Sequence, residues 1–302
     1  MVVVRDVVRV HRLEYPFPVA YLCHVLWGAA YAASAPSDLL KPLVLLVIVA
    51  NLIPIVAQNL LNGAFDVQAD SRNPGKGGIA VATSRLGRVR VIRWALAEMT
   101  VAIVLGVICS VLLGRPLVAV AVVAGVLIEL AYNLEPVRLK RRGVLNPLSL
   151  GLHMSFIPCV GTYAALRDDF PAWVWAVFAG VGLLLIGRTL WWSIPDLRGD
   201  AEAGDRPLAV RYGAHRAMVI ACGVTVLGLL SLGWGLWARY GPWWALPTVA
   251  VCALFLVDKL RTLRWISDTN LPHERRMRRT SLTMVIAADV LLVVVPLVAP
   301  AT

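Results

Sequence analysis

Residues 39–70 read LLKPLVLLVIVANLIPIVAQNLLNGAFDVQAD. The run is almost wholly apolar up to residue 62, and two aspartates follow it. A helix needs about 20 mostly apolar residues to cross the hydrocarbon core of a bilayer, and this run is long enough. The stretch therefore predicts a transmembrane helix that ends at an acidic, water-facing surface.

Similar apolar runs recur along the chain of 302 residues, of which 59% are hydrophobic and only 16% are charged. Soluble domains contain about 25% charged residues, so lipid is the expected main solvent here. The runs predict an all-α fold: a single domain over residues 1–302 that forms a bundle of nine transmembrane helices around a central cavity. The predicted spans are approximately 17–34, 39–62, 91–113, 116–134, 145–166, 172–194, 216–238, 242–260 and 281–299.

Basic residues are distributed unevenly between the two sides of this predicted bundle. The loops and helix ends on one side contain only four of the 29 lysines and arginines, namely Lys41, Arg115, Arg167 and Arg239. In membrane proteins the excess of positive charge lies in the cytoplasmic loops. We therefore expect the cavity to open toward the cytoplasm, on the side of the N-terminus and of four loops: 63–90, 135–144, 195–215 and 261–280.

The composition disfavours several classes of protein and site. The net charge is +11, but no basic stretch alternates with stacking aromatic residues, so nucleic acid is not an expected partner. All five cysteines lie within apolar runs without a CxxC pair, which indicates core residues rather than disulfides or metal ligands. No long apolar core precedes a small-residue cleavage site near the N-terminus, so no cleaved signal peptide is expected. The predicted location is the plasma membrane of a bacterium, with lipid as a partner.

Polar side chains recur every fourth residue where the second predicted span ends. On a helix, Asn62, Asp66 and Asp70 lie on one face. Two carboxylates one turn apart repel each other unless a cation lies between them, and oxygen ligands suit Mg²⁺. The spacing therefore predicts a magnesium site, although a solvated helix end with two acids would give the same pattern.

A second acidic cluster, formed by Asp196 and Asp200 with the nearby Asp205, follows the sixth predicted span. By itself this cluster is also consistent with a polar loop. The two clusters follow helices four spans apart and lie at matching depth, which suggests two related halves that face one cavity. We therefore expect the catalytic, metal-binding carboxylates to be Asp66, Asp70, Asp196 and Asp200, with Asn62 as a further ligand.

Basic side chains surround both clusters. Arginine grips phosphate oxygens with two parallel hydrogen bonds, and lysine adds a point charge. The candidates for binding an anionic substrate are Arg72 and Lys76 after the first cluster, Lys140 in the loop after the fourth span, and Arg198 beside the second cluster.

Arg188 lies inside the sixth predicted span, eight residues before Asp196. A charged residue within a membrane helix faces the protein interior and needs a partner. Two roles are open to it: a salt bridge to Glu98 or Asp289, or a cavity cation that binds an anionic substrate.

These features together fit an allylic prenyl diphosphate, because the acids, Mg²⁺ and bases would bind the diphosphate and a membrane cavity would accept the apolar tail. Metal and basic residues would neutralise the leaving diphosphate while the C–O bond breaks to give an allylic cation. Aromatic faces stabilise such cations. Four aromatic residues are placed for that role, and ordinary packing or interfacial anchoring explains each of them as well: Tyr132, Trp192, Phe65 and Trp191.

The acidic motifs resemble those of the UbiA superfamily of intramembrane prenyltransferases. The family pattern is Asn-x-x-x-Asp-x-x-x-Asp on the second helix and Asp-x-x-x-Asp on the sixth helix of a nine-helix bundle. Residues 62–70 and 196–200 match these two motifs, and residues 132–141 (YNLEPVRLKR) resemble the family's Tyr/Pro/Lys-Arg segment after the fourth helix.

The resemblance implies Mg²⁺-dependent transfer of a prenyl group from a prenyl diphosphate to a small apolar acceptor, either aromatic or isoprenoid. It also implies that the diphosphate is held between the two aspartate clusters. Gly63 stands where many members have aspartate, and residues 72–78 (RNPGKGG) differ from the Arg-Pro segment of quinone-pathway members. The latter segment is more similar to the carotenoid-elongating branch, which argues against ubiquinone or menaquinone synthesis.

Two other functions fit parts of the pattern. A terpene cyclase of the same superfamily would ionise the diphosphate identically and capture the cation with an internal alkene, without an acceptor. A membrane transporter would also have internal repeats and intramembrane charges, but its site usually lies near the bilayer midplane. The acids of this chain cluster instead at the predicted cytoplasmic helix ends.

Overall fold

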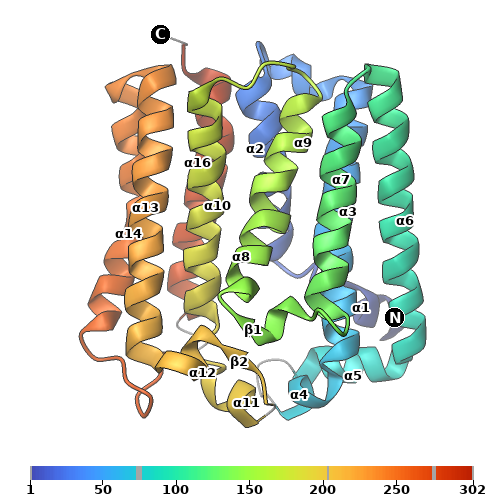
Figure 1. Cartoon of the computed structure of the whole chain (residues 1–302), viewed down its shortest axis with the longest axis vertical. Coiled ribbons are helices and arrows are strands. Elements are labelled where there is room, and N and C mark those ends of the chain that lie inside the picture. Colours follow the sequence, from blue (N-terminus) through green and yellow to red (C-terminus); the bar gives the residue numbers. More distant parts are fainter. Residues whose placement is uncertain (1, 73–76, 203, 274–276, 301–302) are drawn as a thin grey trace.

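The computed structural model describes residues 2–72, 77–202, 204–273 and 277–300, and it confirms the predicted all-α class. Long helices run along one axis of the molecule, and short elements gather at one end of the bundle (Figure 1). Within the described residues, β-structure is limited to two short strands, β1 (Arg142–Gly143) and β2 (Arg206–Pro207).

Among the described residues, six helices are long and apolar enough to cross a membrane, as expected for an integral membrane protein. They are α3 (Pro42–Phe65), α6 (Arg88–Leu113), α7 (Pro116–Asn133), α10 (Ala172–Trp192), α13 (Ala214–Tyr240) and α14 (Pro242–Leu263). Proline begins α3, α7 and α14, at a position where its missing N–H removes no helical hydrogen bond. Apolar side chains such as Val111 on α6 and Leu246 on α14 are exposed, as expected for surfaces that contact lipid.

The other three predicted spans are shorter or interrupted. The first and the ninth correspond to α2 (Phe17–Ala32) and α16 (Leu282–Val298), apolar helices of 16 and 17 residues. The fifth is divided into α8 (Leu145–Gly151), the π-helical turn η3 (Leu152–Phe156) and α9 (Ile157–Ala164). Pro158 accounts for the interruption, because it lacks the N–H that would bond to the carbonyl of Met154.

The polar segments between the long helices form a repeated arrangement at one end of the bundle (Figure 1). α4 (Val67–Arg72) and α5 (Gly77–Leu86) follow α3, and α11 (Leu197–Glu202) and α12 (Leu208–Tyr212) follow α10. β1 and β2 pair in parallel, which joins the loop after α7 to the segment after α11. The N-terminal helix α1 (Val2–Val10) lies at this end, and the C-terminus lies at the opposite end. The remaining turns are η1 (Pro36–Leu40), η2 (Leu139–Arg141) and η4 (Met277–Ser281).

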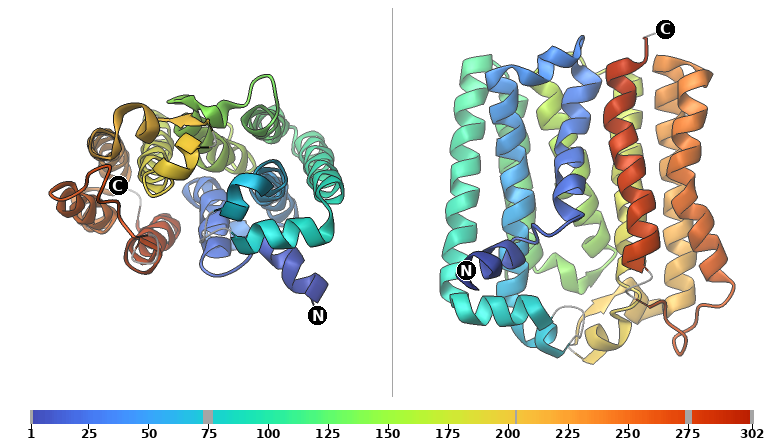
Figure 2. Two further views of the ribbon diagram at one scale, coloured as in Figure 1. Left: turned by 90° about the horizontal axis from the view of Figure 1, so that it is seen from below. Right: turned by 180° about the vertical axis from the view of Figure 1, so that it is seen from behind.

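α2 links the helices of the N-terminal part of the chain to those of the C-terminal part. Seen from the end that carries α4 and α11, the helices coloured blue to teal and those coloured yellow to red lie on opposite sides of the bundle (Figure 2). α2 contacts α3 and α9 on one side and α16 on the other. Trp27 of α2 shares one buried apolar cluster with Phe178 of α10 and Leu232 of α13, so the core is continuous across the bundle.

Glycines allow α10 and α13 to approach closely. A Cβ atom at Gly180 of α10 would lie 2.6 Å from the backbone nitrogen of Leu232 and 2.8 Å from its Cα atom, which are distances that real Cβ atoms do not show. Small residues at helix interfaces let backbones come together in this way, and membrane helices rely on such packing for association.

We expect Gly180→Val to lower the midpoint of thermal unfolding in detergent by several degrees, because overpacking of a helix interface costs about 1–3 kcal/mol. Gly223→Ala is the matched control on α13, since nothing lies within 4 Å of a Cβ atom at that position. Alanine favours a helix over glycine by about 1 kcal/mol, so the control should be neutral or stabilising. Equal unfolding midpoints for the two variants would contradict the close approach at Gly180.

Candidate active site

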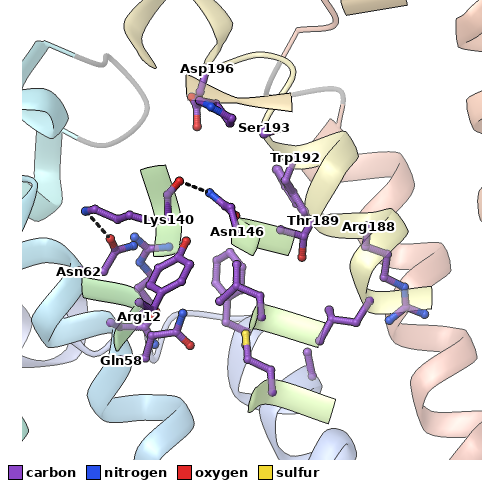
Figure 3. A pocket seen from close by; sticks show the side chains of 18 of the residues that line it. Arg12, Gln58, Asn62, Lys140, Asn146, Arg188, Thr189, Trp192, Ser193 and Asp196 are labelled. Atoms are coloured by element: carbon purple, nitrogen blue, oxygen red, sulfur yellow. Dashed lines mark hydrogen bonds between the residues drawn. The ribbon is translucent and has the colours of Figure 1, made fainter. Parts of the chain in front are cut away.

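A cavity of about 350 Å³ lies among α2, α3, α7, α8, α10 and α16 and reaches the end of the bundle that carries the short elements. One face of each helix forms its wall: on α16 the lining residues are Leu282, Val285 and Asp289, spaced so that they share one helical face. Apolar residues such as Met154 and Leu185 line the interior, and polar side chains gather toward the short elements (Figure 3). The cavity therefore combines a polar, acidic end with a largely apolar interior that also contains Arg188 and Asp289.

The first acidic cluster lies where α3 ends. Phe65 is the last residue of α3, and Asp66 caps the helix, with its N–H bonded to the Asn62 carbonyl at 3.0 Å. Asn62 and Asp66 both line the cavity. Asp70 belongs to α4, is buried, and is not among the residues that line the cavity. The first two members of the predicted polar face thus reach the cavity wall.

The second acidic cluster faces the same cavity. α10 ends at Trp192, before Pro195, and the short helix α11 follows. Asp196 and Asp200 lie one turn apart, with the Asp200 N–H bonded to the Asp196 carbonyl at 2.8 Å. Both residues line the cavity, as does Asp205. Two acidic clusters that are far apart in the sequence are therefore brought to one site.

The oxygen donors at the polar end of the cavity fit a magnesium ion. Asn62 offers an amide oxygen, and Asp66, Asp196 and Asp200 offer carboxylates. In the part of the chain that the structure describes, no three acidic, histidine or cysteine side chains converge into a complete metal site. Mg²⁺ typically binds one or two carboxylates together with substrate phosphates and water, and the donor set suits that mode of binding.

Lys140 lies against the first acidic cluster. Its ammonium group contacts the Asp66 carboxylate and is 3.5 Å from Asn62 Oδ1 (Figure 3). The side chain is only 6% exposed. The Asn146 amide donates to the Lys140 carbonyl at 2.8 Å and holds this loop in place. Because Arg138 Nη2 is also 3.8 Å from Asp66 Oδ1, positive charge offsets this carboxylate within the cavity.

Arg188 has the buried acidic partner that its place in a membrane helix requires. Its Nη1 atom lies 2.8 Å from Asp289 Oδ1. The other candidate partner, Glu98, lies 3.0 Å from His11 Nε2 instead. Arg188 and Asp289 both line the cavity, so the ion pair is also part of the cavity wall.

The other predicted basic residues are placed differently. Arg198 is exposed, and its guanidinium group donates to the Asp268 carbonyl at 3.5 Å. It is not among the residues that line the cavity, so its observed contact is with the segment after α14. Arg72 is the last residue of α4, and Lys76 lies outside the described residues.

Two of the four predicted aromatic residues, Tyr132 and Trp192, line the cavity. Trp191 is buried in the core beneath Lys259, whose ammonium nitrogen is 3.6 Å from the ring centroid. Phe65 is half-buried and is not among the lining residues. Consecutive positions on a helix point in different directions, which explains why Trp192 rather than Trp191 reaches the cavity.

Several lining residues are not indicated by the sequence patterns. Arg12, which has a left-handed backbone with φ of 51°, reaches the cavity from the segment between α1 and α2. No local pattern marks Arg12, because its position depends on how the N-terminal segment folds against the bundle. Gln58 lies one turn before Asn62 on α3, so an extension of the four-residue spacing toward the N-terminus would have found it. Thr189 and Ser193 border the same space (Figure 3).

Residues 21–282 match the model of the UbiA prenyltransferase family. This range includes both acidic clusters and Lys140. The match therefore covers most of the chain and the whole polar end of the cavity except Arg12.

Three proteins with similar sequences share the name lycopene elongase/hydratase. The chain is 30% identical over 210 residues to the lycopene elongase/hydratase of Halobacterium salinarum, a match that covers 67% of this chain and 70% of that protein. It is 26% identical over 219 residues to the lycopene elongase/hydratase of Corynebacterium glutamicum, covering 72% of this chain and 69% of that protein. The match to the protein of the same name from Haloarcula japonica, at 28% identity, covers 63% of this chain and 61% of that protein.

Solved structures share the fold. A UbiA homolog from Archaeoglobus fulgidus bound to GPP and Mg²⁺ superposes with a TM-score of 0.68 at 14% sequence identity, covering 97% of this chain and 99% of that chain. The same homolog bound to DMAPP and Mg²⁺ also gives a TM-score of 0.68, over 96% of this chain and 98% of that chain. At this level of identity the likeness concerns the arrangement of the helices.

Proposed function

Because the chain belongs to the UbiA prenyltransferase family and is a prenyl-transferring enzyme, we propose that its cavity binds a prenyl diphosphate with Mg²⁺ between the two acidic clusters and transfers the prenyl group to an isoprenoid acceptor. One observation carries this proposal. Asn62, Asp66, Asp196 and Asp200 come from separate parts of the chain and line one cavity, beside the buried Lys140. Four oxygen donors and a lysine suit an anionic group that binds together with a metal ion.

The relatives favour a short allylic donor and a long polyene acceptor. The Halobacterium and Corynebacterium relatives are named lycopene elongase/hydratase. The Archaeoglobus homolog binds DMAPP, a C5 allylic diphosphate, in one structure and GPP in another. We therefore infer that this chain adds a C5 prenyl group to the end of an acyclic polyene such as lycopene, which dissolves in the bilayer.

The groups at the site have separate roles in breaking the C–O bond of the donor. The oxygen donors of the two acidic clusters would hold Mg²⁺, which when bound supplies positive charge for the leaving diphosphate. Lys140 adds a flexible ammonium donor that is able to turn from Asp66 toward the phosphate oxygens. Tyr132 and Trp192 present aromatic faces to the cavity, where they would stabilise the allylic cation.

The proposed topology has nine membrane crossings. The six long helices, the shorter helices α2 and α16, and the interrupted unit α8–η3–α9 would each cross once. The excess of basic residues then lies at the end that carries α4 and α11, which favours the cytoplasm for this end, for the N-terminus and for the mouth of the cavity. The proposed location is the plasma membrane of a bacterium.

Purified protein in detergent should release diphosphate from DMAPP when lycopene is supplied in mixed micelles, and mass spectrometry should detect lycopene extended by C5 units. Chelation with EDTA should lower the rate by about 10²-fold or more, because the leaving diphosphate loses its neutralising charge. Added Mg²⁺ should restore the rate, which is the control for irreversible damage by the chelator.

The same assay with other donors and acceptors distinguishes the alternatives. A cyclic hydrocarbon formed from geranylgeranyl diphosphate without an acceptor would identify a terpene cyclase. Transfer to an aromatic compound but not to lycopene would keep the prenyltransferase and replace its acceptor. Failure to release diphosphate from any allylic donor would contradict prenyl transfer and favour a transporter.

A further inference from the structure

A buried polar triad lies in the interior of the cavity, away from the acidic clusters. His24 of α2, Arg188 of α10 and Asp289 of α16 all line the cavity. His24 Nε2 is 3.6 Å from Asp289 Oδ2, and Arg188 Nη1 is 2.8 Å from Asp289 Oδ1. His24 is 3% exposed, Arg188 is 6% exposed and Asp289 is fully buried. The positive charge of the Arg188 guanidinium and the negative charge of the Asp289 carboxylate cancel. With a neutral His24 the triad therefore has no net charge.

The triad lies deeper in the bundle than the acidic clusters. Asp289 is seven residues after the beginning of α16 and His24 is seven residues after the beginning of α2, a rise of about 10 Å along each helix. Both helices begin at the end of the bundle that carries the acidic clusters (Figure 1). Arg188 likewise lies one turn before Trp192, the last residue of α10. A donor whose diphosphate binds at the clusters therefore extends its prenyl group along the cavity toward the triad.

The two ring nitrogens of His24 make no hydrogen bond with the described residues. Nε2 faces the Asp289 carboxylate at 3.6 Å, which is an ion-pair distance, and Nδ1 has no polar partner in the described part of the chain. A proton on Nε2 is the tautomer that Asp289 favours, and it leaves a lone pair on Nδ1. A histidine that is oriented by a carboxylate is an arrangement that enzymes use for a general base.

Prenyl transfer to a carbon nucleophile releases one proton for each diphosphate. The allylic C–O bond breaks with its electron pair on the diphosphate, and the π electrons of an acceptor double bond form the new C–C bond. The positive charge then lies on the acceptor. It is removed when an adjacent C–H bond loses its proton, or when water adds and loses a proton. Both routes need a base at the acceptor end of the cavity.

We propose that His24 Nδ1 accepts this proton, and that Arg188 and Asp289 hold the imidazole in the required tautomer and stabilise the imidazolium. The inference rests on the proposed prenyl transfer and adds the acceptor side of the same site. The proton leaves His24 for water after the product departs, and the neutral imidazole is restored before the next turnover.

A second buried histidine provides a matched control. His153 Nε2 lies 3.6 Å from Glu129 Oε2, the same separation as between His24 and Asp289, and His153 is 1% exposed. His153 is not among the residues that line the cavity. A substitution at either histidine removes a buried imidazole that faces a carboxylate, but only His24 borders the space in which the transfer takes place.

The test compares His24→Gln with His153→Gln in detergent, with DMAPP and lycopene as the probes. Diphosphate release and polyene extension are measured separately, because ionisation precedes the proton transfer that His24 assists. In His24→Gln the yield of extended polyene per diphosphate should fall by about tenfold or more, since a general base contributes about 10²–10⁴-fold to the step that it assists. Without the base, the acceptor cation reverts when the new C–C bond breaks, and water captures the allylic cation, so the missing product should appear as C5 alcohol. His153→Gln should keep the yield of the unaltered protein.

His24→Ala gives a second measurement, which is independent of how glutamine fits the site. Added imidazole should restore the yield of extended polyene, whereas pyrrole, which has the same shape but no basic lone pair, should not. Equal yields in the two glutamine variants, or equal rescue by pyrrole and imidazole, would overturn the role of His24. Failure of the unaltered protein to release diphosphate would instead overturn the proposed prenyl transfer itself.

Discussion

We expect Asp66→Asn and Asp196→Asn each to lower the rate of diphosphate release from DMAPP by about 10³-fold, a loss of about 4 kcal/mol of transition-state stabilisation. The two carboxylates line the same cavity from separate parts of the chain. Asparagine keeps the side-chain volume and removes the negative charge that binds a divalent ion. Each variant should also need a higher Mg²⁺ concentration for half-maximal activity, because one acidic ligand is lost.

Glu202→Gln is the matched control for the second cluster. Glu202 lies on α11 with Asp200, but it is exposed and is not among the residues that line the cavity. The control should therefore turn over at the rate of the unaltered protein, whereas Asp200→Asn should behave like Asp196→Asn. Near-normal turnover in both Asp66→Asn and Asp196→Asn would contradict the proposed metal site, provided that thermal unfolding in detergent shows both variants to be folded.

The fold class follows from local properties of the sequence. The apolar run predicted at 39–62 becomes α3, because a segment in lipid must satisfy its backbone hydrogen bonds within a helix. The four-residue spacing of Asn62 and Asp66 places both on the cavity side of that helix. Hydropathy does not report the π-helical turn η3 inside the fifth apolar run, since the interruption depends on one proline rather than on the average polarity.

The composition of the site depends on contacts between segments that are distant in the sequence. Asp70 continues the four-residue spacing, but α3 ends before it and the short helix α4 carries it to a buried position that is not part of the cavity wall. The sequence leaves both Glu98 and Asp289 open as partners of Arg188, because the choice depends on which helices are neighbours. β1 and β2 have two residues each, too few to give a strand pattern.

Lys140→Met should lower kcat/KM for diphosphate release by about 10²–10³-fold, since one well-placed donor to a developing negative charge contributes that much. Lys140 is buried beside Asp66 and Asn62, where a metal-bound diphosphate is proposed to lie. Arg142→Met is the matched control in the same loop, because Arg142 is exposed and donates to the Pro136 carbonyl at 2.7 Å. The control should leave kcat/KM unchanged, and an equal loss in both variants would indicate a general effect of loop charge.

A double variant separates the two roles that Lys140 has at this position. If Lys140 only offsets the charge of Asp66, its replacement by methionine should have no further effect once Asp66→Asn has removed that charge. If Lys140 binds the substrate, Lys140→Met should weaken the binding of inorganic diphosphate by about tenfold, or about 1.4 kcal/mol, in both backgrounds. Calorimetric titration with diphosphate and Mg²⁺ measures this directly, without the need for turnover. We expect the second result, because the Lys140 ammonium group, beside Asn62 as well as Asp66, is placed at the polar end of the cavity where phosphate oxygens would enter.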